Sequence, residues 1–529
     1  MSSIVTNKVG KYTYIYESES FRDNNGKPQT RKTPIGKIDL KTGQPVYRPE
    51  YLERAQGTDR QPKISDKQSY SVDDIRQSQI LEYGVFNLLS RISEQIGIGE
   101  VTKNVFPDLW ESILSLVFFI VATGEPAMYC EDWITKNESY DCGSMSSQRI
   151  SELLIKITHG QRLDFYEKWG NYRNEQEYFA LDITSVSSYS ELINDVEWGY
   201  NRDKENLPQV NICMLLGENS KLPVFQTVYS GSLKDVSTLK TTLQATSHLN
   251  LHNMSIVMDK GFCSTKNINA MCKKDEAVRF LMAMPFSHKF AKQQVETEKD
   301  VIDSVDNTIT IGSDIIRGIT RMRSWSVDTE LFVHIFLNVE QAEHVKNKLY
   351  GYVSSLRDEA ASPPKDREKA KEIGKYLTLQ KSGEADCTVK IRYDVLESEL
   401  KTAGWLVCVS NHVETAKEAI QLYRAKDVVE KGFLHLKNCL DLARLRVHSD
   451  NAMQNKIFIG FIALIFTAHI HKVMLGHDLY RTMTMRKLIK ALESLRIQYI
   501  KGNRILFPLT KTQKTIFNAF GLPLPESCR

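Results

Sequence analysis

Apolar side chains recur at helical spacing between residues 71 and 170. The i, i+3, i+4, i+7 pattern of an amphipathic helix is clearest at Ile150, Leu153, Leu154 and Ile157. Another helix is expected from Asp108, as an N-cap with Glu111 three residues later, to about Ala122. The pattern therefore predicts a helical domain over residues 71–170. A DNA-binding unit and a plain helical bundle are both consistent with it.

The periodicity changes near residue 175, where five short apolar, β-prone runs begin. They cover residues 177–186, 210–216, 222–230, 254–259 and 278–285. Helical patterns separate the third run from the fourth and the fourth from the fifth, and such connections suit crossovers between strands of one sheet. The pattern predicts a mixed α/β sheet domain whose first part is residues 171–285.

Residues 286–403 interrupt this domain. They are rich in charge and contain further β-prone pieces and a long helical pattern, so we expect an insertion that forms a module of its own. Strand character returns at GWLVCVSN (404–411) and is followed by helices to residue 470. We expect residues 404–470 to complete the sheet domain and residues 471–529 to form a basic C-terminal region.

Charge is uneven along the chain. The net charge of +4 is too small to indicate a partner, but residues 471–529 carry +8 and residues 1–70 carry +5, which leaves −9 for the remainder. Residues 1–70 also contain β-prone pieces such as KYTYIYES, so a small basic β-rich module is expected there. Basic ends favour a polyanionic partner.

Several classes of protein are excluded. The nine cysteines form neither a C-x-x-C pair nor a Cys/His cluster with zinc spacing, which favours reduced thiols. The N-terminus has no apolar core typical of a signal peptide. The most apolar run, Ile457–Ile470, is shorter than the roughly 20 residues that span a bilayer. We therefore expect a cytoplasmic protein with no membrane contact.

Two acidic residues stand where the strand pattern is strongest. Asp182 interrupts FALDIT, and Asp259 ends SIVMD directly after three apolar residues. A charged side chain in a strand core is costly unless it is paired or bound to a metal. Each aspartate alone is more often a satisfied structural residue, but two in one sheet favour a functional site.

A helical pattern near residue 430 supplies a third acidic residue. At 100° per residue Tyr423, Lys426, Glu430 and Lys437 lie within about 60° of one another. A solvated charged face is the ordinary interpretation, although it gives no role to the two aspartates. Three carboxylates without cysteine or histidine ligands are typical of Mg²⁺. Two such ions can clamp a phosphodiester, and adjacent lysines can hold the phosphate backbone.

Three of these segments resemble a known family. LDIT, VMDKGF and YRAKDVVEKGFLHLK, followed by RLRVHSDNAMQNKIFIGFIALI, resemble the DDE transposases of bacterial insertion sequences. The similarity is to the branch with the Tyr-x2-Arg-x3-Glu-x6-Lys signature, in which Lys426 takes the arginine position. Lysine keeps the charge but loses the bidentate grip on phosphate. The resemblance covers most of the chain, including Gly199–Asn211 and Tyr229–Leu239.

The resemblance implies a ribonuclease-H-like core interrupted by a β-rich insertion. It implies that Asp182, Asp259 and Glu430 are catalytic and bind two Mg²⁺, with Mn²⁺ as a substitute. By the same similarity, cut-and-paste transposition would proceed through strand cleavage, hairpin ends and transfer to target DNA. Tyr423, Lys426 and Lys437 would contact the phosphates of the DNA ends. For Trp325, in the insertion, two interpretations are open: stacking on an unstacked base of the DNA, or an ordinary place in the protein core.

The partners implied are double-stranded DNA with terminal inverted repeats, target DNA and a second copy of the chain that pairs the two ends. The implied location is the bacterial cytoplasm, at the nucleoid. Two other functions remain open: a catalytically silent, transposase-derived DNA-binding protein, and a general ribonuclease or structure-selective nuclease on the same fold.

Overall fold

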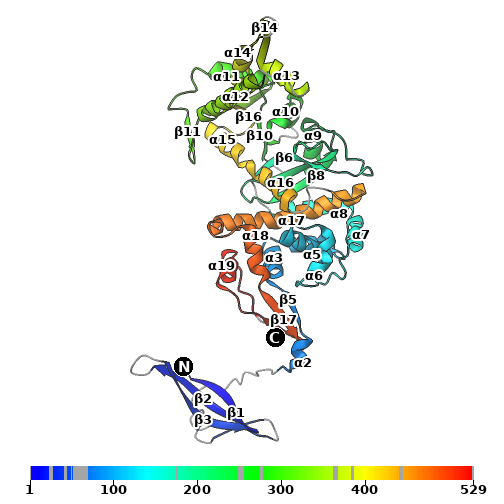
Figure 1. Ribbon diagram of the computed structural model, residues 1–529, viewed down its shortest axis with the longest axis vertical. Helices are drawn as coiled ribbons and strands as arrows, with labels where there is room; N and C mark the ends of the chain where they lie inside the picture. The colour runs from blue at the N-terminus through cyan, green and yellow to red at the C-terminus, as the bar shows by residue number, and fades with distance from the viewer. Residues whose placement is uncertain are drawn as a thin grey trace. The chain divides into compact units, whose positions relative to one another are not determined.

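The computed structural model describes the chain in two units, residues 1–78 and 79–529 (Figure 1). The described residues are 2–22, 28–40, 44–48, 51, 70–173, 177–247, 255–273, 278–360, 367–382, 386–439 and 445–526. The first unit contains a four-stranded antiparallel sheet, in the order β1-β2-β3-β4. Its strands are β1 (Ser2–Val9), β2 (Tyr12–Arg22), β3 (Pro28–Ile38) and β4 (Pro45–Tyr47). The short helix α2 (Val72–Arg76) follows. The β-rich character expected near the N-terminus agrees with this sheet.

The second unit begins with one short strand, and helices follow where the sequence predicted them. After β5 (Gln79–Glu82) come α3 (Gly84–Gln95), α4 (Ile98–Val105), α5 (Trp110–Thr123), η1 (Ala127–Tyr129), α6 (Cys130–Ile134), α7 (Ser147–Lys156) and α8 (His159–Arg173). The expected start of α5 is wrong: Leu109, not Asp108, is its N-cap. The amides of Leu109 and Trp110 both bond to the carbonyl of buried Phe106, so a turn precedes the helix.

A nine-stranded mixed sheet forms the centre of the second unit. Its order is β11-β12-β13-β16-β10-β9-β6-β7-β8, and β9 pairs in parallel with both β6 and β10. The five expected strands are β6 (Tyr178–Ser187), β7 (Gln209–Gly217), β8 (Pro223–Ser230), β9 (Ser255–Met258) and β10 (Arg279–Ala283). The expected helices are α9 (Asp235–Ser247), between β8 and β9, and α10 (Thr265–Met271), between β9 and β10.

Residues 286–403 were expected to form one separate insertion. In the structure one part of them joins the central sheet, and the other part folds around a core of its own. After α11 (Lys289–Glu298), strands β11 (Thr308–Ile311), β12 (Asp314–Ser326) and β13 (Thr329–Leu337) extend the central sheet, because β13 pairs with β16 (Trp405–Ser410). The remainder has a small core of its own. It comprises α12 (Val339–Glu359), α13 (Arg367–Tyr376), β14 (Leu377–Ser382), β15 (Asp386–Ile391) and α14 (Tyr393–Leu400).

The single helix expected around Glu430 is two helices. α15 (Ala416–Ala425) ends at Lys426, and α16 (Asp427–Cys439) begins directly after it. The two helices pack on different strands: α15 contacts β9, β10, β12 and β13, whereas α16 contacts β6 and β7. Because neighbouring strands of a sheet are twisted relative to each other, a break at Lys426 allows both helices to stay in contact with it.

The long helix α17 (Asp450–Gly476) lies between the sheet and the N-terminal helices (Figure 1). By length and composition it could cross a membrane, but 72% of its most apolar window is buried inside the protein. We therefore interpret it as a core helix, as expected. The C-terminal elements are η3 (Leu479–Arg481), α18 (Met485–Glu493), β17 (Arg496–Ile500), β18 (Asn503–Leu506) and α19 (Lys511–Ala519), and β17 pairs with β5.

Candidate active site

The ends of two parallel strands bring Asp182 and Asp259 together. In the β6–β9 ladder Leu181 is paired with Met258. Asp182 follows Leu181 within β6, and Asp259 follows Met258 directly after the end of β9. β9 ends at Met258, and Asp259 keeps an extended backbone before the 3-10 turn η2 (Lys260–Phe262). The register of the sheet therefore places two carboxylates side by side, from residues 77 positions apart.

Burial controls the protonation of Asp182. Desolvation raises the pKa of Asp182 to about 6, and the charge of Asp259 adds to this rise. The positive charges of Lys426 and Arg202 and a 2.8 Å hydrogen bond from the Ile183 amide to Asp182 Oδ1 oppose it. Burial therefore outweighs the two nearby positive charges, and the carboxyl holds its proton more tightly than a carboxyl in water does.

Tyr423, from α15, contacts the second aspartate. Its hydroxyl donates a hydrogen bond to Asp259 Oδ1 at 2.9 Å. Burial, followed by the charge of Asp259, raises the pKa of Tyr423 well above its ordinary value, so the hydroxyl stays protonated as a donor. The sequence predicted that Tyr423 contacts DNA, and here it orients a carboxylate.

Lys426 is the cation of this group. Its side chain is only 6% exposed, and its Nζ lies 3.4 Å from Glu430 Oε1. Burial by itself would lower the pKa of Lys426, but the charges of Asp182, Asp259 and Glu430 outweigh burial and the pKa is raised. A protonated lysine therefore balances the charge of the three acidic residues at the break between the two helices.

Glu430 differs from the aspartates because its side chain is 60% exposed. The donor set of three carboxylates suits a hard divalent cation. Among the described residues, however, no group of three or more His, Cys, Asp or Glu side chains is arranged to hold a metal ion. The chemistry of the three residues fits Mg²⁺, but the exposed carboxylate of Glu430 does not lie close enough to the two aspartates to share a metal ion with them.

A family of known proteins matches the part of the chain that contains this arrangement. Residues 173–466 match the family model described as the transposase DDE domain, which is more than half of the chain. The chain belongs to the DDE transposase family. The matched range begins at the end of α8 and reaches into α17, so it contains the elements that carry Asp182, Asp259 and Glu430.

Other comparisons add little. The DDE transposase chain is similar to the solved structure of a piggyBac transposase synaptic complex with hairpin DNA, with a TM-score of 0.34 and 11% identity. That similarity covers 76% of this chain and 70% of the other, and it is too distant to define the fold further. No curated protein sequence matches.

The two remaining candidates for DNA contact in this DDE transposase have protein partners. Lys437, in α16, forms an ion pair with Asp203 at 2.6 Å, in the loop between β6 and β7. Trp325, in β12, donates its indole N–H to Asn269 Oδ1 at 2.7 Å and stacks on His288. These two contacts do not involve the three carboxylates, and base stacking by Trp325 stays a prediction.

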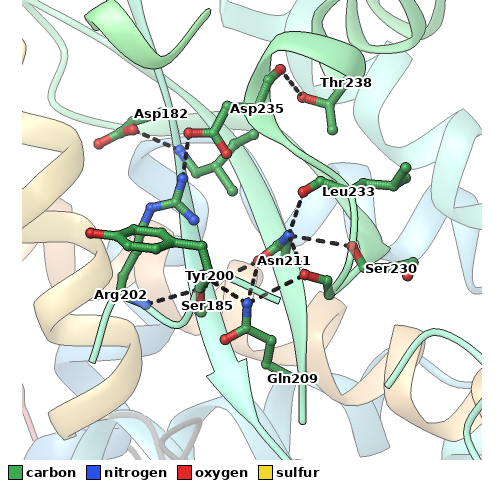
Figure 2. Close-up of polar contacts among 12 residues, drawn as sticks. Asp182, Ser185, Tyr200, Arg202, Gln209, Asn211, Ser230, Leu233, Asp235 and Thr238 are labelled. Atoms are coloured by element: carbon green, nitrogen blue, oxygen red, sulfur yellow. Dashed lines mark hydrogen bonds and ion pairs between the residues drawn. The ribbon is translucent and has the colours of Figure 1, made fainter. Parts of the chain in front are cut away.

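Sequence reasoning missed a polar network beside Asp182 (Figure 2). Arg202 Nη2 donates to Asp235 Oδ2 at 2.5 Å, and the buried Gln209 and Asn211 bond to nearby loop carbonyls. Its members lie within GYNRDKENLPQVN and YSGSLKDVSTL, two segments that carry the family resemblance. That resemblance was the available signal, but the sequence does not show that the two loops meet.

Proposed function

We propose that the protein is a DNA transposase that cleaves the ends of a mobile element and joins them to target DNA. One observation carries the proposal: the β6–β9 register sets Asp182 beside Asp259, and Lys426 links both electrostatically to Glu430. Membership of the DDE transposase family supports the same conclusion.

We further propose a ribonuclease-H-like catalytic core. The order β8-β7-β6-β9-β10, with β6, β9 and β10 parallel to one another, supports this. Asp182 lies on the first of these strands in the sequence, Asp259 follows the fourth, and Glu430 lies on a later helix. The branch with the Tyr-x2-Arg-x3-Glu-x6-Lys signature remains the proposed subfamily, and residues 286–403 remain the proposed insertion.

In this proposal Asp182, Asp259 and Glu430 hold two Mg²⁺, for which Mn²⁺ can substitute. Bound metal would supply water activation and charge stabilisation at the phosphodiester. The chain contributes the orientation of Asp259, through the Tyr423 hydroxyl, and a compensating cation, Lys426. Cut-and-paste transfer through hairpin ends is the proposed reaction course.

The proposed partners are double-stranded DNA with terminal inverted repeats, target DNA and a second copy of the chain. The net positive charge of residues 1–70 and of residues 471–529 supports contact with DNA. Tyr423, Lys426, Lys437 and Trp325 remain proposed DNA contacts. Of these, Lys437 would exchange its ion pair with Asp203 for a phosphate. The proposed location is the bacterial cytoplasm, at the nucleoid.

A catalytically silent DNA-binding protein is the second candidate. The exposure of Glu430, together with the absence of an assembled metal-binding group among the described residues, favours it. A general nuclease is less well supported, because the DDE transposase family covers residues 173–466, including all the elements between Asp259 and Glu430.

The test is strand cleavage of DNA that carries the inverted repeats flanking the gene. Wild-type protein should nick this DNA in Mg²⁺, and Asp182→Ala, Asp259→Ala and Glu430→Ala should each abolish nicking while DNA binding is retained. Asp358→Asn, at an exposed site on α12, is the matched control and should cleave normally. Cleavage retained by any of the three alanine variants would refute the assignment, and a wild-type protein that binds without cleaving would favour the silent protein.

A further inference from the structure

The loop between β6 and β7 contacts two of the elements that carry a proposed catalytic carboxylate and reaches the third through Asp235. The amide of Arg202 donates to Ser185 Oγ on β6 at 3.4 Å, three residues beyond Asp182. Asp203 pairs with Lys437 on α16, the helix of Glu430. Arg202 pairs with Asp235, whose Oδ2 would lie 2.8 Å from a Cβ added at Gly261, in the turn after Asp259.

We propose that Arg202, oriented by Asp235, binds the scissile phosphate of the DNA. This inference rests on the proposed function and adds a phosphate-binding residue that the family signature does not contain. Its chemical basis is the guanidinium group, which presents five N–H donors in a planar fork suited to phosphate oxygens.

The Arg202 guanidinium uses only part of its N–H donors among the described residues. Among the residues that the structure describes, its side chain makes one hydrogen bond, from Nη2 to Asp235 Oδ2. The side chain is 24% exposed, so a ligand at the site can reach it. Its positive charge also acts on the carboxyl group of Asp182. A guanidinium beside Asp182, partly open and only partly bonded, is placed to receive an anionic oxygen.

Hydrogen bonds from β7 hold the loops that carry Arg202 and Asp235 (Figure 2). Gln209 Nε2 donates to the Tyr200 carbonyl at 2.9 Å, and Asn211 Nδ2 donates to the Leu233 carbonyl at 3.0 Å. Both amide side chains are buried in β7. A phosphate ligand benefits from such fixed geometry, because less ordering is needed when DNA binds.

Close backbone packing joins the same two loops. A Cβ added at Gly199 would lie 1.8 Å from the Gly231 carbonyl oxygen, so the loops approach each other more closely than side chains allow. Asp235 begins α9, and its own carbonyl accepts a hydrogen bond from Thr238 Oγ1 at 2.8 Å. Asp235 is therefore fixed by the helix start, and it fixes the guanidinium in turn.

A merely structural ion pair would produce much of the same geometry, so the test must detect phosphate contact. We would measure the affinity of DNA spanning the element–flank junction in Ca²⁺, with an ordinary phosphate or a neutral methylphosphonate at the scissile position. Wild-type protein should bind the methylphosphonate about tenfold more weakly, since a charge-assisted hydrogen bond is lost. In Arg202→Gln this preference should fall to what the bound Ca²⁺ alone contributes, and Arg202→Lys should lie between Arg202→Gln and the wild-type protein.

Two further variants sharpen the result. Asp235→Asn should reduce the preference because the guanidinium loses its orienting partner, whereas Lys204→Gln, in the same loop, should keep the full wild-type ratio. The proposal would be overturned if Arg202→Gln kept the wild-type ratio of affinities for phosphate and methylphosphonate DNA. It would also be overturned if the wild-type protein showed no preference. Cleavage in Mg²⁺, measured in parallel on the wild-type protein, tests the proposed function separately because the affinity ratio does not depend on turnover.

Discussion

The raised pKa of Asp182 predicts that this residue reduces the stability of the metal-free protein. Its carboxyl has a pKa of about 6 in the folded protein, against an ordinary value of 3.8. The folded state therefore binds the proton more tightly than the unfolded state, and stability falls as the pH rises from about 4 to about 6. At 1.36 kcal/mol per pKa unit, the ionised carboxylate lowers the free energy of unfolding by at most about 3 kcal/mol above pH 6.

Asp182→Asn should remove this penalty. The asparagine Oδ1 can still accept the hydrogen bond from the Ile183 amide, so the local backbone is unchanged. In EDTA at pH 7.5 the variant should melt a few degrees above the wild-type protein, and at pH 4 the difference should nearly vanish. Thermal denaturation followed by circular dichroism measures both values.

The control is Asp358→Asn, which removes an exposed carboxylate from α12 and should leave the melting temperature almost unchanged. If Asp182→Asn fails to stabilise the protein at pH 7.5, or stabilises it equally at pH 4, the carboxylate is not held at an energetic cost. The reasoning about its environment would then be wrong.

Three further perturbations have defined outcomes. Lys426→Met should lower the melting temperature in EDTA, because two aspartates lose a buried cation at a cost of about 3 kcal/mol or more, and added Mn²⁺ should recover part of the loss. Glu218→Gln should stabilise the protein at pH 8.5 but not at pH 5 in urea denaturation, since burial raises the pKa of this carboxyl to about 7. Gly199→Ala should lower the free energy of unfolding by about 1–3 kcal/mol in the same assay, because the new Cβ would collide with the Gly231 carbonyl. An unchanged free energy of unfolding would contradict the close packing of the two loops.

The elements of the central sheet could be predicted because their apolar runs are short, strong and separated by helical patterns. All five expected strands were found, and the position of Asp259 directly after one of them was correct. The extent of the sheet could not be predicted. Its continuation through β13 and β16 depends on pairing between segments about 70 residues apart, and periodicity carries no information about partners.

The site was only partly visible in the sequence. The spacing of Tyr423, Lys426, Glu430 and Lys437 suggested one helical face, but the chain breaks at Lys426 so that two helices can follow the sheet. Burial of Lys426 was also unexpected, since a lysine in a charged pattern usually lies in solvent. The role of Arg202 could not be inferred because its partner, Asp235, is brought near only by folding.

The most direct test of the central claim is metal rescue of cleavage at the element ends. Asp182→Cys and Asp259→Cys replace a hard oxygen ligand with a soft thiolate, which binds Mg²⁺ poorly and softer divalent ions better. The account predicts that wild-type protein cleaves in Mg²⁺ and in Mn²⁺, whereas both cysteine variants are inactive in Mg²⁺ and regain cleavage in Mn²⁺. Cleavage by the wild-type protein in EDTA, or by the variants in Mg²⁺ at the wild-type rate, would contradict it.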